Sequence, residues 1–446
     1  MADYSLLYGR ELLLEDIEED FDLEKISKIP AFKEIKGHYY CMRCQTKCLL
    51  KTRYPCTCQG HCLYCRECLA LGKVRECSYF YFLPDPNLFE PLTHPCLKWK
   101  GTLSSQQKQA SIEIKESMRN SSERLVWAVT GAGKTEMLFE GIAEALEKGK
   151  RVCVASPRVD VCLELAPRFQ AAFPEVPIAL LYGGAEDKYR YTQLVIATTH
   201  QLYRFKEAFD VMVIDEIDAF PYYMNEALYF ATEKAKKRKS ATIYLTATPD
   251  KKMRDKIKRG KMEASILPAR YHRNPLPVPK GVYRPHSLLD KRVSQSDAII
   301  RHIHKLLKEK KRFLVFIPTV TLMENVYPLF QSLFQSSRFE MVHSQDTERK
   351  DKVLKMRQGE LDFLMTTTIL ERGVTFPNID VIVIGADHRV YTEAALVQIA
   401  GRVGRAIDYP TGEVTYYHQG WTRAMKGAIK QIKQMNQLAK KKGFIQ

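Results

Sequence analysis

The sequence predicts an α/β fold in which two parallel-sheet lobes follow a small cysteine-rich module. Apolar runs alternate with helical stretches in two successive series, which is typical of parallel strands joined by crossover helices. Ten of the twelve cysteines fall between Cys41 and Cys96, and the other two lie in apolar surroundings typical of a core. With 446 residues the chain is too long for one ordinary hydrophobic core, so two or three domains are expected.

Shifts in composition divide the chain into four segments. The acidic, amphipathic segment 1–36 predicts a helix and a linker, and the module 37–96 holds the cysteines. The two lobes are expected at 97–275 and 276–446, around the proline-rich stretch "ILPARYHRNPLPVPKGVYRP". The lysine-rich tail "AMKGAIKQIKQMNQLAKKKGF" predicts a basic helix at the end of the second lobe.

Ten short apolar runs predict the strands of the two lobes. Runs of this kind are typical of parallel strands that are buried on both faces. In the first lobe they are "RLVWAV", "RVCVAS", "QLVIAT", "DVMVID" and "TIYLTA". In the second lobe they are "RFLVFIP", "FEMVHS", "LDFLMTT", "DVIVIGA" and "GEVTYYH". The order of elements is similar in the two lobes, and no repeat of solenoid length is found.

The formal net charge of +17 favours a polyanionic partner, either a nucleic acid or an anionic membrane surface. The N-terminus is acidic and its apolar run is short, unlike a secretory signal. No stretch approaches the roughly 18 consecutive apolar residues of a membrane-spanning helix. We therefore expect a cytoplasmic protein, for which any contact with the inner face of the membrane would be peripheral.

The stretch "VWAVTGAGKTEM" has the order of a phosphate-binding loop: an apolar strand, a glycine-rich turn and a helix. Gly131 and Gly133 would let backbone N–H groups approach the phosphates of ATP, and Lys134 would reach the outer phosphates. The Thr135 hydroxyl is expected to ligate Mg²⁺, although Ala128 stands where the usual motif begins with glycine. The expected ATP contacts are Thr130, Gly131, Ala132, Gly133, Lys134 and Thr135.

Two acidic residues follow the buried run "VMVI" in the segment "VMVIDEID". Asp215 is expected to hold the Mg²⁺ ion through water. Glu216 is expected to orient and deprotonate the attacking water. Together with the phosphate-binding loop, these acids predict a site that hydrolyses ATP.

Three later motifs indicate which kind of ATPase this is. "TATP" at 246–249, "TTTILERGVTFP" at 366–377 and "QIAGRVGR" at 398–405 follow "GAGKT" and "DEID" in the chain. The five motifs resemble, in order, those of the superfamily 2 helicases and translocases. The resemblance covers about residues 100 to 410 and implies two RecA-like lobes with ATP bound in the cleft between them, at the carboxyl ends of the strands.

The same resemblance implies roles for residues outside the phosphate-binding loop. Arg402 and Arg405 are the arginine-finger candidates, and their spacing of three suggests a shared helix face. Gln398 would contact the γ-phosphate or its water, and Gln107 would read the adenine, with Gln106 as the alternative. Contacts to the nucleic acid are expected from residues of "SPR", "TTHQ" and "TTT", namely Arg158, Thr199, His200, Thr367 and Thr368. Thr246 and Thr248 would couple hydrolysis to movement.

The cysteine module has the spacing of a tetrahedral zinc site. Cys41 and Cys44 form one close pair, and Cys65 and Cys68 form a second after a spacer of twenty residues. Cys62 with Cys65 is a rival second pair. Nine cysteines between 41 and 77 are enough for a second Zn²⁺ ion, and Cys48 and Cys96 compete as ligands. The candidate ligands of the second ion are Cys56, Cys58, Cys62 and Cys77.

Several of these motifs together resemble the ComFA family, the late-competence ATPases of Gram-positive bacteria. They are "CMRC", "YCRECLALGKV", "WAVTGAGKTEMLF", "DEIDAFPY", "LPARYHRNPLP", "TTTILERGVTFP" and "ALVQIAGRVGR", and the match runs from about residue 37 to the C-terminus. The family pattern includes the cysteines at 41, 44, 65 and 68, which favours that set as the zinc ligands. The resemblance implies a DNA-stimulated ATPase that helps to pull single-stranded DNA through the competence channel, together with other competence proteins at the membrane. It leaves the oligomeric state open.

Two alternative functions compete with this interpretation. One is a duplex-unwinding helicase similar to the PriA replication-restart enzymes, acting in restart, in repair or on RNA. It would need a strand-separating wedge, and no obvious insertion provides one. The other is a DNA-binding scaffold whose assembly is switched by ATP. The presence of Glu216, Arg402 and Arg405 argues against a motor that has lost its activity.

Overall fold

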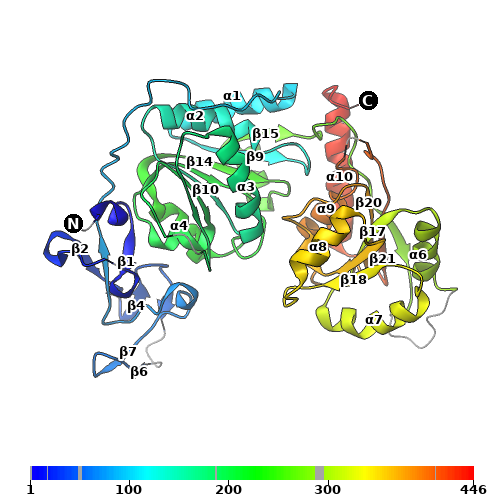
Figure 1. Cartoon of the computed structure of the whole chain (residues 1–446), viewed down its shortest axis with the longest axis horizontal. Helices are drawn as coiled ribbons and strands as arrows, with labels where there is room; N and C mark the ends of the chain where they lie inside the picture. Colours follow the sequence, from blue (N-terminus) through cyan, green and yellow to red (C-terminus); the bar gives the residue numbers. More distant parts are fainter. Residues whose placement is uncertain are drawn as a thin grey trace. The chain divides into compact units, whose positions relative to one another are not determined.

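The computed structural model describes residues 3–17, 19–48, 53–185, 188–286, 296–406 and 408–445 (Figure 1). By compactness the chain divides into two units. The first comprises Met1–Val126 and Lys134–Ser265, and the second comprises Trp127–Gly133 and Ile266–Gln446. The finer division into four segments remains a prediction.

Three strands near the N-terminus form an antiparallel sheet. β1 (Glu11–Leu13) and β2 (Ser27–Pro30) both pair with β8 (Tyr79–Phe82), which lies between them. The helix expected in the acidic segment is wrong, because the described residues up to 36 hold strands and short 3₁₀ turns only. The apolar residues of β1 are buried against a distant aromatic strand, a contact that local periodicity does not reveal. The turns are Tyr4–Leu7, Leu14–Asp16 and Leu23–Lys25.

The cysteines lie on short antiparallel strands and the turns between them. β3 (Phe32–Ile35), β4 (His38–Cys41) and β5 (Lys47–Cys48) form one sheet. β6 (Tyr54–Pro55) and β7 (His61–Cys62) form a separate two-stranded hairpin. A 3₁₀ turn at Leu69–Leu71 follows. So little regular structure provides only a small core, which is typical of metal-stabilised modules.

The N-terminal strands pack against the first parallel sheet within the first unit. Gly9 has a φ of +66°, and a β-carbon there would lie 2.7 Å from the Ala208 side chain. The Lys234 ammonium contacts the buried Glu11 carboxylate, and Lys206 lies 3.5 Å from the same carboxylate. These contacts join the N-terminal end of β1 to the first parallel sheet and to the helix that carries Lys234.

The first parallel sheet has seven strands in the order β11-β12-β10-β13-β14-β9-β15. Its four described pairs among β10 to β14 are all parallel. The strands are β9 (Glu123–Ala128), β10 (Val152–Ser156), β11 (Ile178–Leu181), β12 (Leu194–Thr198), β13 (Phe209–Ile214), β14 (Lys236–Thr246) and β15 (Glu263–Leu267). All five strands expected here are confirmed, whereas β11 and β15 at the two edges were not predicted.

Five helices accompany this sheet (Figure 1). They are α1 (Ser105–Asn120), α2 (Phe139–Glu147), α3 (Val159–Ala172), α4 (Glu226–Ala235) and α5 (Lys251–Lys258). Two 3₁₀ turns, Glu136–Leu138 and Thr199–Arg204, follow strand ends directly or after a short loop. The strands β10, β12 and β13 are buried along almost their whole length, as expected for a sheet covered on both faces.

The second parallel sheet has six strands in the order β16-β21-β20-β17-β19-β18, and all five neighbouring pairs are parallel. The strands are β16 (Lys280–Tyr283), β17 (Arg312–Phe316), β18 (Phe339–Val342), β19 (Phe363–Thr366), β20 (Ile379–Ile384) and β21 (Val414–His418). The five expected strands are confirmed. The edge strand β16 was not predicted.

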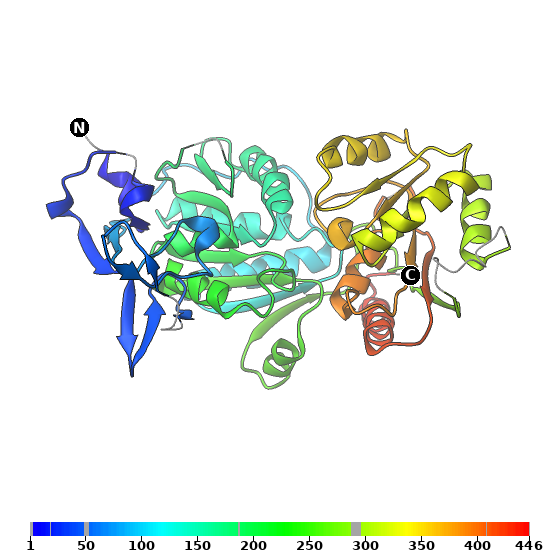
Figure 2. The same cartoon turned by 90° about the horizontal axis from the view of Figure 1, so that it is seen from below.

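Helices cover both faces of this second sheet. Tyr416 donates a hydrogen bond to the Leu396 carbonyl of α9, whereas the next residue, Tyr417, donates one to the Ala298 carbonyl of α6. Successive strand residues point to opposite faces, so α6 and α9 lie on different sides. The helices are α6 (Ala298–Lys308), α7 (Val320–Leu333), α8 (Arg349–Gln358), α9 (Glu393–Ala400) and α10 (Arg423–Lys441), with a 3₁₀ turn at Thr368–Leu370 (Figure 2). The expected basic C-terminal helix is α10.

Candidate nucleotide site and cysteine clusters

The phosphate-binding motif lies where β9 ends. Gly131 and Gly133 have φ values of +80° and +72°, a left-handed conformation that glycine adopts without steric cost. Thr135 is the N-cap of the 3₁₀ turn Glu136–Leu138 that leads into α2, and it is buried. The chain therefore has the strand, turn and helix order that the motif predicts, with glycines where the backbone requires them. Backbone N–H groups at such a helix start suit an anion.

Lys134 and Asp215 come together in the first unit. The Lys134 Nζ lies 3.6 Å from the Asp215 Oδ1. Asp215 directly follows β13, and its backbone N–H donates to the Ala155 carbonyl at 2.8 Å. The carboxylate also accepts a hydrogen bond from the Glu216 N–H at 2.8 Å. Oxygen ligands such as the Asp215 carboxylate and the Thr135 hydroxyl fit Mg²⁺, which prefers hard oxygen donors.

Glu216, the expected base, has a left-handed backbone with a φ of +53°. Non-glycine residues in this region are uncommon and concentrate at functional sites. A turn follows, in which the Ala219 N–H donates to the Glu216 carbonyl at 2.8 Å. The left-handed conformation gives Glu216 a special backbone position that the sequence motif alone does not reveal.

A third acidic residue, Asp218, links the acidic motif to "TATP". Its Oδ1 accepts a hydrogen bond from the Thr246 hydroxyl at 2.7 Å, and its Oδ2 accepts one from the Thr248 hydroxyl. The Thr248 N–H donates to the Thr246 Oγ1 at 2.9 Å. Sequence reasoning singled out the two threonines and missed their shared partner, although Asp218 is the last letter of "DEID".

The two arginine-finger candidates lie beyond the helix that was expected to carry them. α9 ends at Ala400, and Arg402 is buried in the following turn, where its Nε donates to the Glu371 carbonyl at 3.0 Å. Arg405 is half-buried and donates from Nε to the Gly401 carbonyl at 3.0 Å. A shared helix face is therefore wrong, because α9 ends at its C-cap Gly401 before both arginines, and the left-handed Gly404 lies between them. Gln398 lies inside α9 and is buried.

The buried Arg270 holds this turn in place and was missed by sequence reasoning. Its Nη1 donates to the Gly404 carbonyl at 2.5 Å and its Nη2 to the Gly401 carbonyl at 3.3 Å. Burial, assisted by the charge of Arg405, lowers the pKa of Arg270 to about 9. Arg270 lies in the stretch "LPARYHRNPLP", which also contains Arg273. The available signal for a role of Arg270 was that it is the arginine directly before the aromatic Tyr271.

The adenine candidate Gln107 already has a local structural role. Its side-chain oxygen accepts a hydrogen bond from the Ser104 N–H at 2.8 Å, which caps the first turn of α1. Both Gln107 and Gln106 are buried. Both glutamines therefore lie in the first turn of α1. Their contact with adenine remains a prediction.

The nucleic-acid candidates follow the carboxyl ends of parallel strands. Arg158 lies after β10 and is half-buried, whereas Thr199 begins the turn after β12 and is fully buried. Burial lowers the pKa of the neighbouring His200. Thr367 is buried and Thr368 half-buried, directly after β19 in the second unit. These are the strand ends at which ligands bind in open α/β sheets.

Four buried thiols form a first cluster, which we call the buried cluster: Cys41, Cys44, Cys65 and Cys68. Their sulfur atoms all lie within 4.8 Å of one another, with Cys41 to Cys68 at 3.9 Å and Cys44 to Cys65 at 3.4 Å. Sulfurs around one Zn²⁺ ion lie about 3.8 Å apart, since each Zn–S bond is about 2.3 Å in a tetrahedron. The four thiols fit a structural zinc site.

The remaining candidate thiols form a second cluster, which we call the exposed cluster: Cys56, Cys58, Cys62 and Cys77. Cys56 lies 3.6 Å from Cys77, and Cys58 lies 3.4 Å from Cys62, between sulfur atoms. Each of these cysteines is half-buried or exposed. The rival pairing of Cys62 with Cys65 is not formed, because the two residues belong to different clusters. Among the described residues neither cluster includes Cys48 or Cys96.

Comparison with known proteins decides the family. The family model described as "Competence protein ComFA N-terminal domain" matches residues 4–82. The competence protein ComFA of Bacillus subtilis (strain 168) is 45% identical over 410 residues, which cover 91% of this chain and 87% of that protein. The competence protein ComFA of Streptococcus pneumoniae (strain ATCC BAA-255 / R6) is 39% identical over 437 residues, covering 98% and 99%.

The chain belongs to the ComFA family. Models described as "Type III restriction enzyme, res subunit" and "Helicase conserved C-terminal domain" match residues 100–251 and 295–407. Among solved structures, S. cerevisiae Dbp5 bound to RNA and ADP BeF3 has a TM-score of 0.52 at 14% identity, covering 75% of this chain and 91% of that one. The solved structure shows that this ComFA chain has the RecA-like helicase fold. The ComFA relatives and the two helicase-type domain models support a competence-related helicase-type ATPase. Among the described residues, no helix combines the length and apolarity that crossing a membrane requires.

Proposed function

We propose that the chain is a DNA-stimulated ATPase that moves along single-stranded DNA and drives the uptake of transforming DNA during natural competence. The observation that carries the proposal is the contact of Lys134 with Asp215 at the glycine-rich loop, in a chain of the ComFA family. An ammonium beside a carboxylate at the carboxyl edge of a parallel sheet suits a nucleotide phosphate and its metal ion.

Each motif has a proposed part in ATP hydrolysis. The loop from Thr130 to Gly133 would bind phosphate through backbone N–H groups, and Lys134 would neutralise the outer phosphates. Thr135 and Asp215 would hold Mg²⁺, which supplies charge stabilisation to the transferring phosphoryl group. Glu216 would orient and deprotonate the attacking water. The remaining proposed contacts are Arg402 and Arg405 to the γ-phosphate, Gln398 to the γ-phosphate or its water, and Gln107 to the adenine.

The proposed coupling to DNA passes through the Asp218 bridge. A displacement of the acidic motif on phosphate release would reach Thr246 and Thr248, since both hydroxyls donate to the same carboxylate. The phosphates of the strand would be bound by Arg158, Thr199, His200, Thr367 and Thr368. Such contacts position a strand without reading its sequence, which suits uptake of arbitrary DNA.

Both cysteine clusters are proposed to hold Zn²⁺. Four thiols within 4.8 Å of one another match a tetrahedral four-cysteine site in each case. The metal would stabilise a module whose strands are too short to form a large core. We further propose that the chain acts at the cytoplasmic face of the membrane with the competence channel and other competence proteins. The names of its relatives support a part in competence.

Lys134→Ala tests the proposal most directly. Removing the ammonium should lower the ATP turnover by at least about a hundredfold, as for other groups that stabilise transition-state charge. Lys252→Ala on α5 removes the same charge from an exposed position and should leave turnover unchanged. Wild-type turnover in Lys134→Ala would refute the phosphate-loop assignment.

The same assay separates the candidate functions. ATP turnover is measured at fixed salt without nucleic acid and with single-stranded DNA, duplex DNA or RNA. Stimulation by single-stranded DNA, rising with strand length, supports the uptake motor. Stimulation only by a forked duplex or by RNA would favour an unwinding helicase. Strand binding without steady turnover would favour the ATP-switched scaffold.

A further inference from the structure

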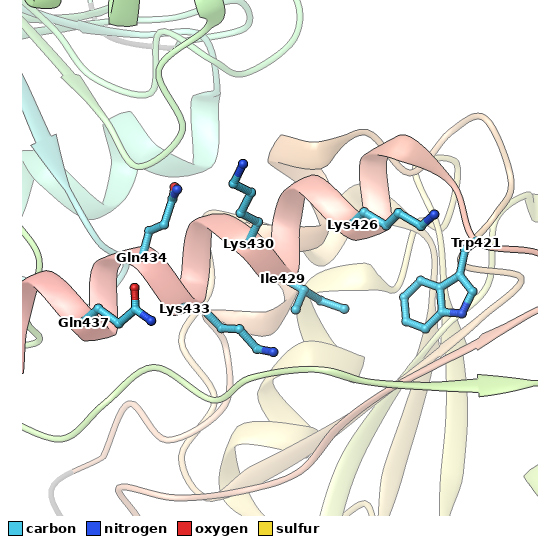
Figure 3. Close-up of a pocket in the computed structure, with 7 residues that line it drawn as sticks. All are labelled: Trp421, Lys426, Ile429, Lys430, Lys433, Gln434 and Gln437. Carbon is cyan, nitrogen blue, oxygen red and sulfur yellow. The ribbon is translucent and has the colours of Figure 1, made fainter.

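Helix α10 presents a lysine-rich face that none of the motifs of the ATPase uses. Its apolar side is buried in the second unit, through residues that recur at helical spacing: Met425, Ala428, Ile432, Met435 and Ala439. The opposite side lines a shallow open groove of about 560 Å³ together with Trp421, which precedes the helix (Figure 3). The groove residues are Trp421, Lys426, Ile429, Lys430, Lys433, Gln434 and Gln437.

The charge of this groove is entirely positive. Lys426, Lys430 and Lys433 are exposed, and none of them has an ion pair among the described residues. At 1.5 Å per helical residue, the three ammonium-bearing positions span about 10 Å of the helix axis. No acidic residue lines the groove or occurs within α10. The carboxylate of Glu393 in α9 packs instead at Gly427. An anionic ligand is therefore favoured.

Trp421 adds an aromatic surface at the end of this lysine row. The residue is 49% exposed, and its ring lies beside that of His418, with ring centroids 4.6 Å apart. The ring also packs on the backbone of Gly281, where a β-carbon would come within 2.3 Å of it. A tryptophan that is supported by its neighbours and still half-exposed is suited to stacking on a base. The side chain gives the groove a second kind of contact besides charge.

We propose that this α10 groove binds single-stranded nucleic acid, with the three lysines on its phosphates and Trp421 stacked on a base. The proposal rests on the proposed function as a DNA motor and adds a contact surface outside the helicase motifs. Glutamines between the lysines offer hydrogen bonds to sugar or phosphate oxygens. Lysine rows with an aromatic side chain are the usual composition of a sequence-independent strand-binding surface.

A lipid surface fits the same groove less well. A helix that binds a membrane exposes a large apolar face to the acyl chains. The apolar face of α10 is instead buried in the protein, and the exposed face carries lysine and glutamine with only Ile429 and Trp421 between them. The observations therefore favour nucleic acid.

Salt dependence of binding tests the three lysines. Affinity for a fluorescent oligothymidylate is measured by anisotropy between about 50 and 200 mM salt, where each phosphate contact to a single strand contributes a slope of about −0.7. In K426Q/K430Q/K433Q, the slope of the logarithm of the binding constant against the logarithm of the salt concentration should be less steep by about 2 units. The matched triple K305Q/K308Q/K310Q removes equal charge at the end of α6 and should keep the wild-type slope. Thermal unfolding checks that both triples are folded.

Trp421 is tested independently through its ring. Trp421→Ala should weaken binding of the oligothymidylate about tenfold, and Trp421→Phe should restore most of the loss because phenylalanine also stacks. If K426Q/K430Q/K433Q keeps the wild-type salt dependence of oligothymidylate binding, the inference about the groove is wrong. The proposed DNA motor would still stand in that case, provided that the wild-type chain binds the oligothymidylate. Failure of the wild-type chain to bind any single strand would overturn both. If K426Q/K430Q/K433Q loses binding to anionic vesicles but binds DNA as the wild type does, the groove is a membrane-binding surface and the inference is wrong.

Discussion

The two cysteine clusters have the same ligand chemistry in opposite environments. The thiols of the buried cluster are no more than 1% exposed and belong to the hydrophobic core of the first unit, beside Leu63, Val74 and Phe80. Those of the exposed cluster lie on the small β6–β7 hairpin and at Cys77, next to solvent. Metal in the first would support a core, whereas metal in the second would hold one hairpin. Ligand count alone therefore does not measure how much a site stabilises a fold.

The charged residues beside the two clusters also differ in their burial. Arg43, between two ligands of the buried cluster, donates to the Leu71 carbonyl at 2.9 Å, pairs with Asp16 at 3.2 Å and lies over the Phe80 ring. Near the exposed cluster, Arg53 pairs with Glu76 on the surface at 2.9 Å. An ion pair that holds a fully buried arginine is costly to break, whereas a pair on the surface contributes little.

Among these variants, Cys41→Ser should cause the largest loss of unfolding free energy. Losing one ligand of the buried cluster should release a metal ion and destabilise the N-terminal module by more than about 3 kcal/mol, since structural zinc contributes directly to folding. Metal content by elemental analysis and urea unfolding followed by proteolysis measure the two effects. Cys48→Ser removes a nearby thiol outside both clusters and should change neither. Full metal content in Cys41→Ser would rule out Cys41 as a ligand.

Arg43→Met should have an intermediate effect. The substitution keeps the bulk of the side chain while removing the hydrogen bonds to Leu71 and Asp16, which should cost about 2 to 3 kcal/mol. Asp16 also contacts Arg204 at 3.5 Å, so it keeps one partner. Urea unfolding of Arg43→Met and of the surface variant Arg53→Met should show the loss only in the former. If Arg43→Met and Arg53→Met lose the same free energy of unfolding, burial does not determine how much the surroundings of each cluster contribute to stability.

The smallest effect is expected from Cys58→Ser. This change should release one metal ion and lower the free energy of unfolding by about 1 kcal/mol or less, because the exposed hairpin carries little buried area. In the wild-type chain, a chelator should likewise remove one metal equivalent quickly and the second only slowly. A single slow phase with one metal per chain would show that the exposed cluster is free thiol.

The parallel sheets were predictable because their strands are continuous apolar runs, a purely local property. The edge strand β16 escaped since it is only partly buried and has no continuous apolar run, whereas β11 escaped although its four residues are all apolar. β1 and β8 escaped for another reason: neither strand is stable without its distant partner. Local patterning thus recovers every central strand of the two sheets, whereas of their four edge strands only β18 was predicted.

The same limit applies to the candidate site. Lys134 and Asp215 lie in short motifs, so their meeting was predictable. The partnership of Asp218 with Thr246 and Thr248 crosses between two strand ends and needed the fold. Spacing also misled for Cys62 and Cys65. Exposure alternates along Cys62, Leu63, Tyr64 and Cys65, as in an extended strand, so two residues three apart face opposite sides and join different clusters.

The packing of Trp421 on Gly281 sets a rule for comparing relatives of this chain. A β-carbon at position 281 and an indole at position 421 would occupy the same space. The two positions are therefore expected to vary together through evolution, although they lie on different elements far apart in the sequence. A relative with alanine or a larger residue at 281 should carry a smaller side chain at 421, and the pair offers a way to sort the family by the shape of this surface.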